Sequence, residues 1–139
     1  GIVPGGGVAL VRAGEDLKGL IGDNEDESTG IQIIANSIEE PLKQIVKNAG
    51  GEGAVIVAKV REGKGDFGYN AKIDKYENLF KTGIIDPTKV TRVALENATS
   101  VAGMLLTTEC VLADIKEENS TPMPGGGGMP MGGGMPGMM

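Results

Sequence analysis

The chain has 139 residues, a formal net charge of −6, no histidine and a single cysteine, Cys110. This length allows one domain at most. The acidic balance argues against nucleic acid as a partner, because phosphate binding requires clustered Lys and Arg. Without histidine there is no imidazole acid–base or metal chemistry, and one cysteine excludes an internal disulfide. No run of about eighteen apolar residues is present, so the sequence predicts no membrane span and no membrane partner.

Near the N-terminus three glycines, Gly5 to Gly7, directly precede a helical pattern that extends to Leu17. Glycine at a helix start lets the backbone approach another group closely, and the free amide groups there favour oxygen-rich ligands. The alternative, which the residues alone favour, is a turn packed tightly against neighbouring structure. The spacing excludes a dinucleotide fingerprint. Because the chain begins at Gly1 without methionine, we expect it to be a fragment of a longer protein.

An acidic connector at residues 22–29 precedes an apolar stripe at residues 31–49. The carboxylates suit the positive end of a helix, and they lack the spacing of a calcium loop. Pro41 interrupts the stripe, which predicts either a kink or a second helix with proline in its first turn. A pair of glycines then ends the pattern, and residues 54–60 favour a further short helix over a buried strand.

Residues 63–74 differ from their surroundings, because they are rich in glycine and carry the aromatic residues Phe67 and Tyr69. This composition predicts a small β-hairpin or an extended loop. Asn70 offers both a donor and an acceptor, which recognition of a purine edge requires. The alternative, an Asx turn closed on its own backbone, is the more common role of a lone asparagine. A short helix that ends at Gly83 is predicted next.

The longest helical pattern runs from Asp86 to Leu105. Asp86 can cap the first amide groups of this helix, and Pro87 suits its first position. Apolar residues recur on one face at three- and four-residue spacing, and the small residues among them allow another helix to approach closely. We therefore predict the central helix of a packed, mainly α domain, with Asp86 at its start as a candidate for chemistry.

The C-terminal part of the chain has two features. Residues 109–115 are typical of a terminal strand, which needs a pairing partner in missing sequence or in another subunit. Residues 116–139 are low in complexity and hold six of the seven methionines among glycines and prolines. We expect this tail to be disordered. Methionine suits loose contacts with varied apolar surfaces, and the alternative is a neutral flexible terminus. The predicted organisation is a folded part at 1–115 followed by the tail.

Several longer motifs, in this order, resemble the C-terminal part of a group I chaperonin of the GroEL type. They are PGGGVAL (4–10), PLKQIVKNAG (41–50), GYNA (68–71), GIIDPTKVTR (83–92), ATSVAG (98–103) and TTEC (107–110), followed by the Gly/Met-rich tail. The resemblance covers essentially the whole chain. It implies the second half of an equatorial, nucleotide-binding domain, which is a mainly α fragment with a small β-hairpin and a terminal strand.

The resemblance also implies a set of adenosine contacts: Gly6, Asn70, Ala71, Lys72, Ile84 and Asp86. In the family the position of Gly6 brings backbone to the ribose, and the positions of Asn70, Ala71 and Lys72 line the adenine pocket. The position of Ile84 packs near the base, and that of Asp86 binds ribose hydroxyls. Lys72 stands where a small residue is often found, so we expect only a backbone contact there. The residue chemistry agrees, because a glycine backbone, an amide and a carboxylate suit adenosine.

The family's phosphate-binding Gly-Asp-Gly-Thr-Thr segment and its catalytic aspartate lie outside this sequence. We therefore assign no catalytic residue and no metal ligand, and we expect ATP as the cofactor, with Mg and K ions held by the other half of the domain. The implied parent is an ATP-driven folding machine of two seven-membered rings that encloses non-native polypeptides under a co-chaperonin lid. The strand at 110–115 would pair across a subunit boundary. We expect a cytoplasmic location, as in bacteria, with mitochondrion and plastid as alternatives.

Two other classes remain open at this stage. One is a helical adaptor or scaffold that binds a partner through its acidic surface and tail without nucleotide. The other is a stand-alone small-molecule enzyme, which ranks lowest because no histidine, reactive cysteine pair or carboxylate dyad is evident.

Overall fold

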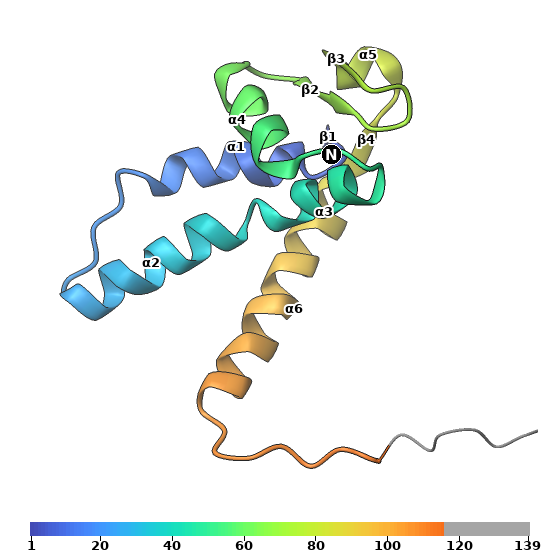
Figure 1. Cartoon of the computed structure of the whole chain (residues 1–139). Helices are drawn as coiled ribbons and strands as arrows, with labels where there is room; N and C mark the ends of the chain where they lie inside the picture. The colour runs from blue at the N-terminus through green and yellow to red at the C-terminus, as the bar shows by residue number, and fades with distance from the viewer. Residues whose placement is uncertain (116–139) are drawn as a thin grey trace, which may run out of the picture. The chain divides into compact units, whose positions relative to one another are not determined.

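The structure is a computed structural model that describes residues 1–115, so the prediction of a disordered tail lies outside the described residues. Gly1–Thr107 form one compact unit. Its elements are β1 (Ile2–Pro4), α1 (Val8–Leu17), α2 (Glu25–Ser37), α3 (Glu40–Asn48), α4 (Gly53–Glu62), β2 (Phe67–Asn70), β3 (Lys75–Asn78), α5 (Leu79–Thr82), β4 (Ile85–Pro87) and α6 (Thr88–Leu106) (Figure 1). The predicted mainly α class with a small hairpin is confirmed. Within the described residues, no helix is both long and apolar enough to cross a bilayer.

The acidic connector caps α2, as its composition predicts. The side chain of Asn24 accepts a hydrogen bond from the N–H of Glu27 at 2.9 Å, which satisfies one of the free amide groups of the first turn. Glu25, Asp26 and Glu27 all lie in that turn, where the positive end of the helix favours negative charge.

α3 begins and ends where the sequence predicts. Pro41 lies in its first turn, so the second helix forms rather than a kink. At the other end Gly50 is left-handed, with φ 83°, and its N–H donates to the carbonyl of Lys47 at 3.0 Å. The N–H of Gly51 donates to the carbonyl of Val46 at 2.9 Å. These two bonds form a Schellman motif, which ends the helix by satisfying its last carbonyl groups.

The core is formed by α1, α3, α4, β2 and α5, and α6 contributes nothing to it. The core residues are Val8, Val11, Leu42, Val46, Val57, Val60, Tyr69 and Leu79. No residue of α6 is buried, and Leu106 at its end is 87 % exposed. The prediction that α6 is the central packed helix is therefore wrong for the described residues. Amphipathic spacing shows which face of a helix is apolar, but it does not supply the element that covers that face.

The glycine turn before α1 packs closely against α3. Gly7 has φ 82°, and a Cβ atom built on it would lie 2.8 Å from the backbone nitrogen of Leu42. Gly6 also has positive φ, 64°, but a Cβ atom there would meet nothing within 4 Å. Tight packing therefore explains Gly7, whereas the space beside Gly6 is open.

A buried carboxylate links three helical segments. Glu39, which precedes α3, is only 7 % exposed. Its carboxylate forms an ion pair with the guanidinium of Arg61 in α4, and the Nζ of Lys43 lies 3.5 Å from its other oxygen. Arg61 also reaches Glu15 of α1, with Nε 3.2 Å from a carboxylate oxygen. A carboxylate at this depth requires such partners, because its loss of hydration is otherwise uncompensated.

The predicted terminal strand is absent. Residues 109–115 carry no strand in the described structure. A strand exists only while its N–H and C=O groups bond to a neighbouring strand, and residues 1–115 show no such neighbour for this segment. Pairing with another subunit stays a prediction.

Replacement of Gly7 by alanine should destabilise the fold. The Gly7→Ala side chain would be held at positive φ and would overlap the backbone at Leu42, so we expect a loss of about 2 kcal/mol or more. For a domain of this size this lowers the melting temperature by several degrees. The matched control is Gly6→Ala, which carries the strain of positive φ without the overlap. Equal melting temperatures for the two variants would contradict the close packing at Leu42.

Removal of the Arg61 side chain should also destabilise the protein, because Arg61→Ala leaves the buried carboxylate of Glu39 with Lys43 as its one cation among the described residues. We expect a loss of about 2–3 kcal/mol in the free energy of unfolding, measured by denaturant titration. The double variant Arg61→Met/Glu39→Gln removes both charges and should recover most of this loss. A double variant no more stable than Arg61→Ala would show that the buried charge is not the cause.

Candidate functional site

A short antiparallel pairing brings the glycine turn to the segment that contains Asp86. β1 pairs with β4, with Val3 opposite Asp86 and Pro4 opposite Ile85. One residue further, the N–H of Gly5 donates to the carbonyl of Ile84 at 3.0 Å. Three of the predicted contacts, at positions 6, 84 and 86, therefore lie on adjacent strands or their direct extensions, although the sequence separates them widely.

Asp86 does not cap α6, which corrects the prediction from sequence. The residue lies in β4, and the first helical residue is Thr88, preceded by Pro87 in an extended conformation with ψ 127°. The reason is tertiary: Pro87 is opposite Ile2 in the sheet, and this pairing keeps the chain extended past Asp86. The carboxylate is half-buried, and it forms no hydrogen bond or ion pair within residues 1–115. Its oxygens are therefore free to accept hydrogen bonds from a ligand.

The hairpin of β2 and β3 has one aromatic face. Phe67 and Tyr76 stack with ring centroids 5.8 Å apart, and the ammonium of Lys59 lies 4.6 Å from the Tyr76 ring. The hydroxyl of Tyr69 donates to Asp74 at 2.8 Å, and this bond raises the pKa of Tyr69. Burial raises the pKa of Tyr76. Both phenols therefore stay protonated at neutral pH, and this face serves structure rather than acid–base chemistry.

The opposite face of the hairpin meets the start of α1. Gly68, Asn70 and Glu77 share this face, because side chains alternate along each strand and Gly68 is opposite Glu77. A Cβ atom on Gly68 would lie 2.8 Å from a methyl carbon of Val8, the first residue of α1. Leu79 lies against the same glycine. The face that carries Asn70 is therefore packed, at Gly68, against the residue that directly follows the glycine turn.

Asn70 closes the turn between the two strands. Its Oδ1 accepts from the N–H of Lys72 at 3.0 Å, and its Nδ2 donates to Glu77 Oε1 at 2.6 Å. This is the Asx turn that the sequence left as the alternative to base recognition. A carboxamide has two N–H groups and two lone pairs, so one of each remains for a ligand. The backbone at positions 71 and 72 is held in place by the same turn.

A hydrogen bond joins α5, which directly follows the hairpin, to the strand segment that contains Asp86. The N–H of Ile84 donates to the carbonyl of Leu79 at 2.9 Å, and Leu79 belongs to the core. Ala71 and Ile84 both pack against that core from its edge, while Lys72 is exposed. The structure thus unites positions 6, 84 and 86 by strand pairing, and it attaches positions 70–72 to the same core through α5.

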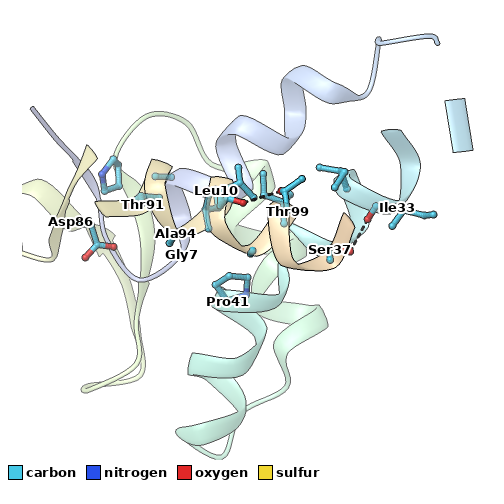
Figure 2. Close-up of a pocket in the computed structure, with 16 residues that line it drawn as sticks. Gly7, Leu10, Ile33, Ser37, Pro41, Asp86, Thr91, Ala94 and Thr99 are labelled. Atoms are coloured by element: carbon cyan, nitrogen blue, oxygen red, sulfur yellow. Dashed lines mark hydrogen bonds between the residues drawn. The ribbon is translucent and has the colours of Figure 1, made fainter. Parts of the chain in front are cut away.

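A groove that the sequence analysis missed runs along α6 beside Asp86. Its volume is about 540 Å³, and Figure 2 shows it extending from Asp86 at one end, past Ala94 and Thr99, to Ile33 of α2 at the other. Among the described residues that line it, Asp86 alone is charged. The signal in the sequence was the row of small residues on α6, which predicted the close approach of a helix. Within the described residues that space is a groove.

The described residues contain no cluster of three or more His, Cys, Asp or Glu side chains that could hold a metal ion. The polar groups at the site are one free carboxylate, the backbone of a glycine turn and the backbone of an Asx turn. This set can bind a neutral polar molecule that has hydroxyl groups.

One comparison with known families bears on this site. The model of the TCP-1/cpn60 chaperonin family matches residues 1–116, which includes all six predicted contacts and most of the chain. Membership of this family implies self-association and binding of unfolded polypeptides in general, and it disfavours the adaptor interpretation. By this match the chain belongs to the TCP-1/cpn60 chaperonin family.

Proposed function

We propose that this chain is the C-terminal part of the nucleotide-binding domain of an ATP-dependent chaperonin of the group I, GroEL type. It binds the adenosine end of ATP within a machine that encloses and refolds non-native polypeptides. The observation that supports this proposal is the β1–β4 pairing, because Asp86 lies on β4 and the paired strand β1 leads directly into the glycine turn that contains Gly6.

The ribose is assigned to Asp86 and Gly6. A carboxylate accepts hydrogen bonds from two vicinal hydroxyl groups, and bonds of this kind are stronger than neutral ones because the acceptor is charged. Asp86 has both oxygens available within the described part of the chain. The open space beside Gly6 allows a ligand to approach the backbone, which a side chain at this position would obstruct.

The base is assigned to the Asx turn and to Ile84. The aliphatic side chains of Ala71 and Ile84, at the edge of the core, suit the flat faces of a purine. The backbone at Lys72 and the remaining donor and acceptor of Asn70 suit its polar edge. The Lys72 side chain is exposed, in keeping with the expectation of a backbone contact only.

The phosphates, the Mg and K ions and the residues of hydrolysis are assigned to sequence outside this chain. ATP supplies, when bound and hydrolysed, the free energy that drives the folding cycle. The residues described here contribute binding and orientation of the nucleoside. No residue of this chain is assigned to the chemical step.

For assembly we propose two back-to-back rings of seven subunits, a co-chaperonin lid and a cytoplasmic location. The exposed apolar residues of α6 and the groove beside it support burial against other parts of such an assembly. Residues 110–115 would gain their missing strand partner across a subunit boundary.

Asp86→Ala in the intact protein should weaken ATP binding about tenfold or more, because charge-assisted hydrogen bonds to the ribose are lost. Since the side chain has no partner within the described residues, its removal should leave the melting temperature nearly unchanged. Titration calorimetry and thermal melting measure the two effects separately. Asp16→Ala, at an exposed aspartate of α1, is the matched control. ATP affinity within twofold of the original protein would remove Asp86 from the site.

Deletion of the residues after Ser120 should leave ring assembly intact, because the Gly/Met-rich composition cannot form a packed interface of its own. Sedimentation analysis of the truncated protein should show the same assembly mass, reduced only by the deleted residues. Dissociation into smaller species would show that the tail is structural.

A further inference from the structure

We propose that Glu77 is a positioning residue for the adenine end of the site. Its carboxylate holds the amide of Asn70 in the one orientation that closes the turn at residues 70–72. This inference rests on the proposed nucleotide site, to which Glu77 had not been assigned.

The hairpin register brings the two side chains together. Gly68 is opposite Glu77 and Asn70 is opposite Lys75, so Asn70 and Glu77 are diagonal neighbours on one face. Nδ2 of Asn70 donates to Oε1 of Glu77 at 2.6 Å in a partly buried setting. The bond is short because its acceptor is charged. No bulky side chain stands opposite Glu77, since that position is a glycine.

This bond selects one of the two orientations of the amide. A carboxamide can place either its oxygen or its nitrogen on a given side. A carboxylate only accepts, so Glu77 requires Nδ2 on its own side and leaves Oδ1 facing the N–H of Lys72, 3.0 Å away. The reversed amide would set two oxygens against each other at Glu77 and two donors against each other at Lys72.

The selected orientation supports the backbone assigned to the base. The N–H of Ile73 donates to the carbonyl of Asn70 at 3.3 Å, which is a long bond, so the side-chain bond to Lys72 is the shorter of the two that close this turn. Without Glu77 the amide keeps only its bond to the N–H of Lys72, so the orientation of the amide and the direction of the backbone at 71 and 72 are less firmly fixed. Loss of Glu77 should therefore weaken recognition of the base while the hairpin stays folded.

The hairpin itself has other supports. Arg12 of α1 donates to the carbonyl of Phe67 at 2.9 Å, and Tyr69 is held by Asp74 on the opposite face. The stack of Phe67 on Tyr76 also lies on that face. None of these contacts involves Glu77, so its removal should change the turn without unfolding the hairpin.

The test compares Glu77→Ala with Glu77→Gln in the intact protein. Glu77→Ala should weaken ATP binding about three- to tenfold, the effect of one hydrogen bond, and should narrow the preference for ATP over GTP. Glu77→Gln should retain most of the ATP affinity and most of the preference for ATP over GTP, because its amide oxygen can accept the same hydrogen bond from Asn70. Lys75→Ala, at the exposed residue opposite Asn70, is the control and should change neither. Titration calorimetry with each nucleotide supplies the affinities, and melting temperatures should agree among the variants.

A second measurement needs no nucleotide. Hydrogen exchange of the Lys72 amide should be faster in Glu77→Ala than in Glu77→Gln or Lys75→Ala. If exchange of the Lys72 amide were unchanged in Glu77→Ala, the inference would be overturned even if ATP affinity fell. A fall in the melting temperature of Glu77→Ala large enough to explain its weaker ATP binding would overturn it as well. Absence of ATP binding by the unaltered protein would instead refute the proposed function, while the exchange result would still decide whether Glu77 positions Asn70.

Discussion

The pairing of three residues near the start of the chain with three residues before α6 is the constraint on which the candidate site depends. It places the glycine turn beside Ile84 and Asp86, and it keeps Pro87 extended, so that Asp86 is a strand residue with a free carboxylate. A two-stranded sheet of this size is not stable by itself. The bond from the N–H of Thr88 to the carbonyl of Gly1, at 3.0 Å, and the packing of the glycine turn on α3 support it.

The remaining structure divides into a packed part and an open part. α1, α3, α4 and the hairpin surround one core, and the ion pairs of Arg61 with buried Glu39 and with Glu15 link three of its helical segments. Two of the residues assigned to the nucleoside, Ala71 and Ile84, pack against the edge of that core and remain partly exposed. α2 and α6 bury no residue and leave an apolar groove between them. Such exposed apolar surface agrees with a protein of a self-associating family.

The glycines show how one residue type serves two purposes within three positions. At Gly7 a side chain would overlap α3, whereas at Gly6, where φ is also positive, the space beside the backbone is open. The first is a packing constraint and the second is the one that suits a ligand. The sequence offered both interpretations for the same turn; the structure shows the close packing at Gly7, and a ligand contact at Gly6 stays a prediction.

By itself the sequence determined the features that depend on neighbouring residues. The start of α3 at Pro41, its end at Gly50, the hairpin and the Asx turn at Asn70 all follow from local backbone preferences and short-range hydrogen bonds. Only the tertiary structure decided that Asp86 pairs with Val3 rather than capping α6, that α6 lies outside the core and that Glu77 reaches Asn70. These features depend on which other segment of the chain packs or pairs with each residue, and the local periodicity of the sequence does not specify that segment. The prediction of a terminal strand at residues 109–115 was wrong for the described residues for the same reason, because a strand forms only when another strand pairs with it.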